Sequence, residues 1–344
     1  MKVALVRGGF LNNFEVQNYS ESNRSIKITA MSSLQSIHQK FSLPVVKLPS
    51  LYDLGFPTWV ANRTLGDRQL LLGLEKAVIG FDVVHTADSH YYYSYQLAKM
   101  RRNGSIKRLV ATSWETIPFN NESAAAKKRN KYFSMKYVDR FLCYTSRAKK
   151  CLITEGVMAG KITVIPLGVD LNKFKPASLS SARTKKDKVR ILFTGRDVPE
   201  KGLLDLRTSI NYLIEVGKVE LLVAGNVPYE RMPEVYRLAD IFVMPSKTTK
   251  TWEEQYGMAL IEAMASGLPI VAYGSGSIPD ILGKAGIVVD EGDVKALEKK
   301  LTELVNYPHK RKALGILARK RAEKHFDSRI FAKKLDAFYR SVMK

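Results

Sequence analysis

Short apolar runs rich in Val, Ile and Leu recur along this chain about every 20 to 40 residues, and this pattern constrains the fold most. Runs of this length are typical of strands that are buried on both faces in a parallel sheet. Longer segments with helical spacing separate them, so the sequence predicts alternating strands and helices. In the first half the predicted strands are residues 3–6, 44–48, 82–86, 108–112, 141–145 and 162–165, and the predicted helices are residues 26–41, 65–78, 89–102 and 123–138.

A polar stretch divides this pattern into two blocks. Residues 166–188 lose the periodicity and gather Pro, Ser and Lys, which is typical of a linker. The two blocks predict two doubly wound α/β domains, residues 1–168 and 169–326, that face each other across a cleft and bind ligands at the carboxyl ends of their strands. In the second block the predicted strands are residues 190–194, 220–224, 240–244, 269–273 and 286–289.

The last segment, residues 327–344, carries apolar side chains at helical spacing with Lys and Arg between them. This pattern predicts an amphipathic helix that closes back on the first domain. Its apolar positions are Ile330, Phe331, Leu335, Phe338, Tyr339 and Val342.

No targeting or membrane-spanning segment is evident. The longest apolar runs fall far short of the roughly 18 residues that cross a bilayer, and the run at the start is too short for a signal peptide. The two cysteines, Cys143 and Cys151, have neither CxxC spacing nor a histidine cluster, which argues against a disulfide scaffold or a zinc site. We therefore expect a cytoplasmic protein that is soluble or peripheral at a membrane.

The chain is strongly basic, with 55 Lys and Arg residues against 33 Asp and Glu residues and a formal net charge of +22. A field of that sign attracts polyanions. Nucleic acid, anionic lipid and phosphorylated metabolites all satisfy this condition. Both halves of the chain carry the excess, which argues against a detachable basic tail.

The most informative stretch is residues 253–269. It predicts a tight turn at Gly257 and a helix that ends at Gly267. Glu262 stands among apolar residues of that helix, so its carboxylate must find a hydrogen-bond donor, for which a pair of ribose hydroxyls would serve. Glu254 precedes the helix, whose first N–H groups attract a diphosphate. Equally, Glu262 could pair within the protein and Glu254 could be a solvated loop acid.

A second stretch, residues 191–202, ends a strand and continues into a loop rich in Gly and Pro. The loop brings Arg196 and Lys201 close to the start of the next helix. A guanidinium fork and a point charge suit a pyrophosphate whose negative charge grows as it departs. The alternative is two solvated cations in a chain that holds many.

These residues resemble the retaining glycosyltransferases of family 4, which have the GT-B fold. The family's E-x7-E signature is present as Glu254 to Glu262, and residues 195–202 also match. The resemblance is specific over residues 160–290 and weaker over the first domain and the closing helix. Further matching stretches are residues 164–170, 239–246 and 274–280, and, more weakly, residues 82–85 and 144–149.

The resemblance implies roles for residues of the second domain, which would bind the nucleotide-sugar donor. Glu262 would bind the nucleotide ribose, and Glu254 would face the donor sugar. Arg196 and Lys201 would hold the diphosphate. The backbone at Gly257 and Met258 would assist them.

The resemblance assigns acceptor binding to the first domain. There the turn Gly8-Gly9 would close over the diphosphate or the acceptor. The family commonly has Thr-x-His-Asp after the fourth strand, whereas this chain has Trp114 at the place of the His that contacts the sugar. The motif therefore leaves the sugar undefined.

The activity implied is retaining transfer of a hexose-type sugar from a nucleotide-diphosphate sugar to a hydroxyl of a glycan, a lipid-linked sugar or a small molecule. In such enzymes the leaving phosphate takes the acceptor proton, so charge stabilisation and positioning carry most of the catalysis. The histidines show no metal-site spacing and Asp-x-Asp is absent. We therefore expect metal independence and no cofactor besides the nucleotide sugar, which is a co-substrate.

The segment 127–140 mixes cations with aromatic residues. Such a helix could dock on anionic lipid and bring the site to a lipid-linked acceptor. The alternative is a solvated helix face that packs Phe133 and Val138 inward.

Two other functions remain open from the sequence. A sugar-nucleotide epimerase shares the two-domain fold and the diphosphate clamp but needs no acceptor. A basic nucleic-acid-binding protein would explain the charge. No recognised nucleic-acid motif supports it, so we expect no nucleic-acid partner.

Overall fold

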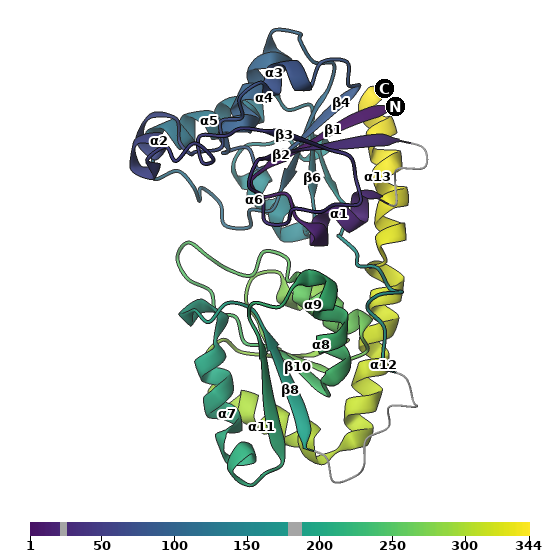
Figure 1. Ribbon diagram of the computed structural model, residues 1–344. Coiled ribbons are helices and arrows are strands. Elements are labelled where there is room, and N and C mark those ends of the chain that lie inside the picture. The colour runs from purple at the N-terminus through teal and green to yellow at the C-terminus, as the bar shows by residue number, and fades with distance from the viewer. Residues whose placement is uncertain (21–25, 178–187) are drawn as a thin grey trace. The chain divides into compact units, whose positions relative to one another are not determined.

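The computed structural model describes residues 1–20, 26–177 and 188–344 (Figure 1). These residues form two compact units. The first combines Met1–Leu167 with Ser328–Lys344, and the second is Gly168–Asp327. Residues 178–187 of the predicted linker lie outside the described residues, and residues 170–177 contain no helix or strand.

The first unit is built on a seven-stranded sheet of order β3-β2-β1-β4-β5-β6-β7, and every neighbouring pair is parallel. The strand order reverses between β1 and β4. In open α/β sheets such a reversal opens a crevice at the carboxyl ends, where ligands bind. The strands are β1 (Lys2–Gly8), β2 (Lys27–Ser33), β3 (Val45–Leu48), β4 (Val83–Ala87), β5 (Leu109–Ser113), β6 (Arg140–Cys143) and β7 (Ile162–Val164), and the helices are α1 (Asn13–Ser20), α2 (Thr58–Thr64), α3 (Leu74–Ala77), α4 (Tyr92–Arg102), α5 (Ala125–Tyr137), α6 (Ser146–Thr154) and α13 (Ser328–Met343).

Helix α13 belongs to the first unit although it ends the chain, which confirms the predicted closing helix. Its apolar face is buried and it packs on α1. Arg108, the residue before β5, donates from Nε to the Val342 carbonyl over 2.8 Å. The helix is therefore joined to the sheet by apolar burial and by hydrogen bonds.

Two predicted helices of the first unit are wrong. Residues 26–41 form strand β2 and an irregular loop instead, because Ile26, Ile28 and Ala30 alternate into the core and pair the strand with β1. Of residues 65–78, only Leu74–Ala77 is helical. Gly66 and Gly73 both take positive φ there, which an extended helix excludes. Helices α4 and α5 are confirmed.

The second unit holds a five-stranded parallel sheet of order β12-β11-β10-β8-β9. All five predicted strands are present. Side chains of β8, β10 and β11 form its core with helices α7 and α11. The strands are β8 (Val189–Thr194), β9 (Val219–Ala224), β10 (Ile241–Met244), β11 (Ile270–Tyr273) and β12 (Ile287–Val289), and the helices are α7 (Leu203–Glu215), α8 (Met232–Leu238), α9 (Met258–Ala265), α10 (Ile278–Leu282), α11 (Val294–Asn306) and α12 (Pro308–His325).

The predicted fold class, two doubly wound α/β units with a closing helix, is confirmed. Among the described residues, no helix combines the length and the apolar composition that a membrane span requires.

Candidate functional site

Three adjacent strands of the second sheet, β8, β10 and β11, end at one edge, where their loops meet. The amide of Lys247, after β10, donates to the Glu200 carbonyl, after β8, over 2.8 Å. The Ser277 amide, after β11, donates to the Glu254 carbonyl over 2.9 Å. Because ligands bind at the carboxyl ends of such strands, this edge is the candidate site of the second unit.

Lys201 and Glu254, both predicted site residues, form an ion pair at this edge, with Lys201 Nζ 2.8 Å from Glu254 Oε2. Ser246 donates from Oγ to the same carboxylate oxygen over 3.2 Å. The Lys201 ammonium also lies 4.6 Å from the centre of the Trp252 ring. Both charged side chains keep some exposure, 19% for Lys201 and 12% for Glu254, so solvent reaches the pair.

Two glycines allow the loops to approach one another this closely. Gly202 has a φ of +71°, and a Cβ on it would lie 1.9 Å from the Pro245 carbonyl oxygen. Gly276 has a φ of +54°, and a Cβ on it would lie 2.2 Å from the Glu254 carbonyl oxygen. A side chain at either position would push the loops apart and separate Lys201 from Glu254.

Helix α9 begins beside the Glu254 carboxylate. Gly257 caps the helix in the left-handed conformation, and Met258 is its first residue. A Cβ on Gly257 would lie 3.6 Å from Glu254 Cγ. The N–H groups of the first turn favour a negative charge at this place. This is the contribution that the sequence assigns to the backbone at Gly257 and Met258.

Glu262 is buried inside α9, as its apolar neighbours predict. Tyr236 of α8 donates its hydroxyl to Glu262 Oε2 over 2.9 Å. Burial raises the pKa of Glu262 to about 7, although hydrogen bonds from Tyr236 and Tyr229 act in the opposite direction. The carboxylate therefore has tyrosine donors from its own chain, and its ribose-binding role stays a prediction.

Arg196 differs from Lys201. Its side chain is exposed at the end of β8, and it makes no hydrogen bond or ion pair with the described residues. The structure thus brings Lys201, Glu254, Gly257 and Met258 together and leaves the charge of Arg196 unpaired in the loop nearby.

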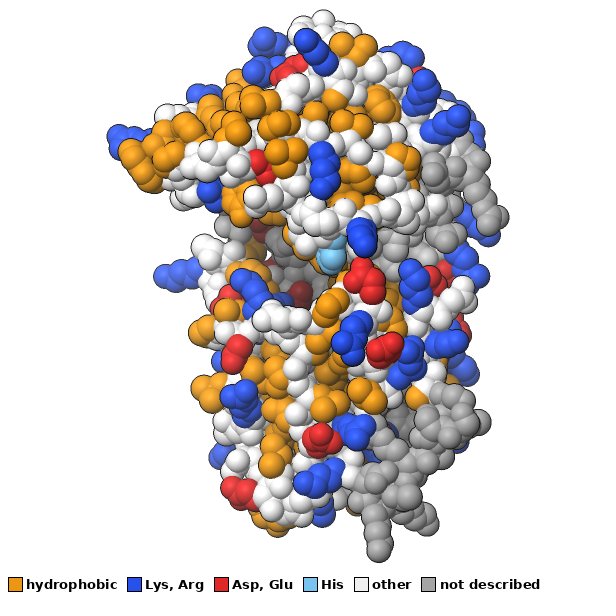
Figure 2. Space-filling model, viewed as in Figure 1, with side chains coloured by type: hydrophobic (Ala, Val, Ile, Leu, Met, Phe, Trp, Pro, Cys, Tyr) orange, Lys and Arg blue, Asp and Glu red, His pale blue; other side chains and the backbone are white. Residues whose placement is uncertain are grey.

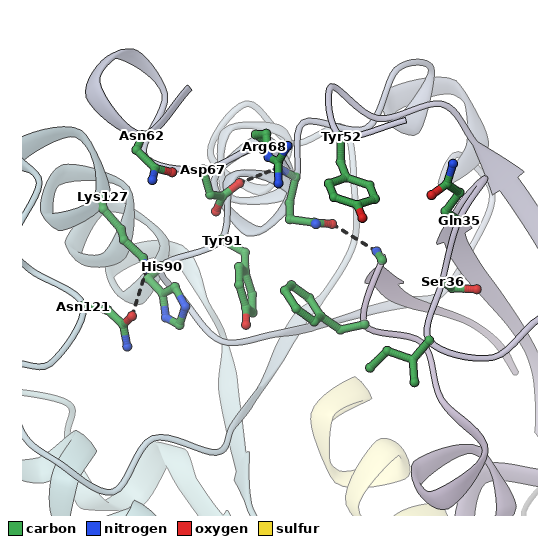
Figure 3. A pocket seen from close by; sticks show the side chains of 14 residues that line it. Gln35, Ser36, Tyr52, Asn62, Asp67, Arg68, His90, Tyr91, Asn121 and Lys127 are labelled. Atoms are coloured by element: carbon green, nitrogen blue, oxygen red, sulfur yellow. Dashed lines mark hydrogen bonds between the residues drawn. The ribbon is translucent and has the colours of Figure 1, made fainter. Parts of the chain in front are cut away.

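In the first unit, the predicted turn after β1 borders a pocket of about 670 Å³ (Figure 3). Gly8 turns the chain with a φ of +53°, and the Gly9 amide donates to Gln69 Oε1 over 3.0 Å. The loops after β1 and β4 both contribute to the pocket, so it lies where the strand order reverses. The roles predicted for Gly8 and Gly9 stay predictions.

Trp114 follows β5 in the first unit and is half-buried. Its amide donates to Asp88 Oδ1 over 3.0 Å, and its ring meets the Tyr144 ring edge-on at 4.4 Å. It is not among the described residues that line the pocket. Burial raises the pKa of Asp88 to about 7, and Asp88 has a φ of +39°. Asp88 thus combines a buried carboxylate with a backbone conformation that is rare for a residue other than glycine. Its carboxylate positions the Trp114 loop through the hydrogen bond from the Trp114 amide.

Sequence reasoning missed three residues of these sites: Ser246, Tyr236 and Asp88. Ser246 and Asp88 each lie two residues after the end of a predicted strand, so their position near a carboxyl end was a usable signal. Tyr236 had no such signal, because it reaches Glu262 from a different helix.

Both halves of the chain match glycosyltransferase families. Residues 38–173 match the family described as Glycosyltransferase Family 4, and residues 217–321 match Glycosyl transferases group 1. Sulfoquinovosyl transferase SQD2 of Arabidopsis thaliana is 30% identical over 250 residues, covering 63% of this chain and 45% of that protein. The GDP-mannose-dependent alpha-(1-6)-phosphatidylinositol monomannoside mannosyltransferase of Mycolicibacterium smegmatis is 30% identical over 190 residues. The match covers 45% of this chain and 50% of that protein. The chain spans about half the length of these curated relatives.

Solved structures share the fold over nearly the whole chain. Sucrose-phosphate synthase of Thermosynechococcus elongatus has a TM-score of 0.74 at 18% identity and covers 99% of both chains. Anabaena HepE, in complex with UDP and glucose, has a TM-score of 0.76 at 15% identity and covers 99% of this chain and 100% of its own. The fold is therefore that of the GT-B glycosyltransferases. The chain belongs to the family 4, group 1 glycosyltransferases.

Proposed function

We propose that this protein is a retaining, metal-independent glycosyltransferase that moves a hexose-type sugar from a nucleotide-diphosphate sugar to a hydroxyl group. The observation that carries the proposal is the Lys201–Glu254 ion pair, which lies beside the first turn of α9 at the carboxyl ends of β8, β10 and β11. This edge can bind a diphosphate through the Lys201 ammonium and the N-terminus of α9. It can bind a sugar through the Glu254 carboxylate.

The cations and the carboxylates of this site would have different roles in the transfer. A departing diphosphate gains negative charge, and Lys201, Arg196 and the first N–H groups of α9 favour that charge. Glu254 would then face the sugar, where an oxocarbenium-like centre gains positive charge. Lys201 shares its charge with Glu254 in the structure, so a bound diphosphate would compete for that lysine. Glu262 would accept hydrogen bonds from the ribose.

The comparisons support this function over an epimerase, because the relatives are named for sugar transfer. HepE, which shares the fold, was crystallised with UDP and glucose. We infer that the acceptor is a glycan, a lipid-linked sugar or a small molecule with a free hydroxyl group.

The test is thermal unfolding with UDP, GDP and ADP sugars, followed by turnover with added acceptors. A ligand at 100 times its dissociation constant stabilises a protein by roughly 2.7 kcal/mol. We expect one nucleotide to raise the Tm, and Lys201→Met to reduce the shift. The matched control is Arg190→Met, which removes an ion pair at the opposite end of β8. Turnover without any acceptor would support the epimerase instead, and salt-sensitive nucleic-acid binding without a nucleotide-sugar shift would support the nucleic-acid alternative.

We also propose peripheral contact with an anionic membrane on its cytoplasmic face, made by α4 and α5 of the first unit. The two helices pack together, and their sequences hold eight Lys and Arg residues and no Asp or Glu. Two of the eight do not face outward, because Lys127 lines the pocket and Lys131 is buried in ion pairs with Glu122 and Glu155. Several of these cations lie over aromatic rings, as Arg102 does over Phe133 at 5.5 Å and Lys136 over Tyr137 at 5.6 Å. Interfacial helices combine the same two features.

Helix α2, which packs on α5, adds apolar surface to this face. Trp59 on α2 is 72% exposed, and Leu54 just before it is 62% exposed. Figure 2 shows hydrophobic side chains with basic ones at their edge over this part of the first unit. Exposed apolar residues beside cations favour a membrane interface over a purely solvated surface.

Vesicle co-sedimentation tests the contact. We expect binding to phosphatidylglycerol vesicles and not to phosphatidylcholine vesicles, and about 1 kcal/mol less binding free energy for each of Arg129→Glu and Lys136→Glu. Lys295→Glu and Lys299→Glu on α11 of the second unit are the matched controls. Equal losses in both pairs would mean that only the net charge matters, and the assigned face would be wrong.

A further inference from the structure

The pocket of the first unit has an aromatic wall that the proposed donor site does not use. The Phe10 and Tyr91 rings lie 4.8 Å apart between centroids, and the Tyr91 and His90 rings lie 4.2 Å apart. Figure 3 shows the His90 and Tyr91 rings side by side in the pocket. The apolar faces of the Phe10 and Tyr91 rings suit the C–H faces of a sugar or another cyclic polyol. The pocket volume of about 670 Å³ lies within the range of small-molecule sites.

The acid that lines the pocket is held by the backbone. Asp67 Oδ1 accepts from the Gln69 amide over 2.6 Å, and Oδ2 accepts from the Tyr92 amide over 2.9 Å. It is the only Asp or Glu among the described lining residues. Because both of its oxygens have amide donors, its carboxylate fixes the chain at the start of α4 instead of pairing with a nearby cation.

Two cations of the pocket are left without a carboxylate partner among the described residues. The Arg68 guanidinium lies over the Tyr52 ring at 4.6 Å and makes no hydrogen bond within the described chain. Lys127 donates only to the neutral amide oxygen Asn121 Oδ1, over 2.8 Å. Burial lowers the pKa of Lys127, although Asp67, Asp88 and Glu115 act in the opposite direction. A bound anion would therefore relieve a desolvated charge.

His90 supplies a neutral polar group to the same pocket. It is 8% exposed and makes no hydrogen bond to the described residues, although its ring lines the pocket. Burial lowers the pKa of His90, and the nearby charges of Lys127 and Lys131 lower it further. A neutral imidazole both donates and accepts a hydrogen bond, which suits a hydroxyl group.

We propose that this pocket binds the acceptor and that the acceptor is a polyol carrying a phosphate group. Arg68 and Lys127 bind the phosphate, His90 binds a polyol hydroxyl, and the aromatic wall contacts the ring. A phosphomonoester carries a charge of about −1.5 to −2 near pH 7, which matches two cations. That this ligand is the acceptor rests on the proposed transferase function. The binding of a phosphorylated polyol does not depend on that function.

Calorimetric titration without any nucleotide sugar tests the binding. The probes are glucose 6-phosphate and myo-inositol 1-phosphate, each compared with its unphosphorylated parent. We expect each phosphate to bind at least about 10-fold more tightly, a difference of about 1.4 kcal/mol. Arg68→Gln and Lys127→Met should each remove most of this preference. The neighbouring Arg63→Gln and Lys128→Met, which do not line the pocket, should keep it.

Three results would overturn the proposal: no binding of either phosphate, equal affinity for phosphate and parent, or a preference that survives the double change at Arg68 and Lys127. His90→Phe sharpens the assignment, because it should weaken phosphate and parent by the same factor while the preference remains. A structural role for His90 alone would instead lower the Tm and leave the affinities unchanged.

The phosphate can come from a soluble sugar phosphate or from a lipid headgroup, and a second arm separates the two. Vesicles that contain phosphatidylinositol 4-phosphate, whose headgroup carries a phosphomonoester, should bind more tightly than phosphatidylglycerol vesicles, with the same dependence on Arg68 and Lys127, if the natural source is a headgroup. Dependence confined to the soluble probes identifies a free phosphate. Donor binding is read separately from the Tm shift with nucleotide sugars. Probe binding without that shift would refute the transferase, and the shift without probe binding would refute this pocket.

Discussion

Two ion pairs of this protein place the same kinds of charge in opposite surroundings. Arg7 and Glu15 in the first unit meet at 2.9 Å with side-chain exposures of 1% and 3%. Lys201 and Glu254 in the second unit meet at 2.8 Å but remain partly exposed. The distances are nearly equal, so the surroundings alone distinguish the two pairs.

The Arg7–Glu15 pair has protein partners on every side. Arg7 also donates to the Val6 and His85 carbonyls and to the Tyr19 hydroxyl, and Glu15 accepts from Tyr144 over 2.7 Å. A buried pair keeps its charges only if such additional hydrogen bonds are present. It therefore belongs to the architecture of the first unit, whereas the Lys201–Glu254 pair keeps a solvent-facing side that a ligand can reach.

The largest expected effect concerns the buried pair. Arg7→Met leaves Glu15 buried without its partner, and we expect the free energy of unfolding to fall by about 3–5 kcal/mol. Lys201→Met should change it by less than about 1 kcal/mol, because that pair is partly solvated. Urea unfolding of both variants measures the difference. If Arg7→Met were as stable as the unmodified protein, the comparison between the two pairs would fail.

The next effect concerns the partly exposed Lys201–Glu254 pair. We expect Glu254→Ala to lower kcat/KM for sugar transfer by about 100- to 1,000-fold, the usual cost of removing one charge-stabilising group. Nucleotide affinity should stay within a few fold, since the diphosphate contacts would remain. Lys201→Ala and Arg196→Ala should weaken both binding and transfer. Steady-state kinetics with nucleotide calorimetry measures these effects, and full transfer by Glu254→Ala would contradict the role of this carboxylate.

A third effect concerns a buried carboxylate without a cationic partner among the described residues. The pKa of Glu262 is raised to about 7 from an ordinary 4.5. Between these pH values the native state keeps a proton that the unfolded chain has lost, so stability falls as pH rises from about 4.5 to 7. Glu262→Gln should remove this slope, on the order of 3 kcal/mol in total.

Thermal unfolding at several pH values checks this prediction. Asp67 and Asp88, whose pKa values are raised to about 6 and about 7, contribute slopes of the same sign. The difference between the unmodified protein and Glu262→Gln therefore isolates Glu262. Parallel curves for the two proteins would show that burial does not hold a proton on this residue.

The smallest effect lies at the edge of the buried network. Tyr339 of α13 contacts His85 Nδ1 at 2.6 Å, and His85 Nε2 contacts Thr112, which also accepts from Arg7. Tyr339→Phe removes one of these hydrogen bonds inside the core, and we expect a loss of about 1 kcal/mol. The exposed Tyr307→Phe is the control in urea unfolding. An unchanged stability in Tyr339→Phe would place this hydroxyl outside the network.

The local hydrophobic pattern of the sequence predicts most of the strands, because strands buried in a parallel sheet have continuous runs of apolar residues. It failed at β2, where the alternation of Ile26, Ile28 and Ala30 was mistaken for helical spacing. Only pairing with β1, for example Val3 with Ile28, selects the strand. A short apolar segment can satisfy both periods, and its neighbours then decide between them.

The sites divide in the same way. Lys201, Glu254 and Gly257 belong to two short motifs, so the sequence by itself determined a charged edge at the carboxyl ends of the second sheet. Arg68, His90 and Lys127 come from three separate segments of the first unit, and each one taken alone is an ordinary residue of a basic chain. Only the tertiary structure decided that they share a pocket, because the folding of the sheet brings together segments whose spacing along the chain carries no signal.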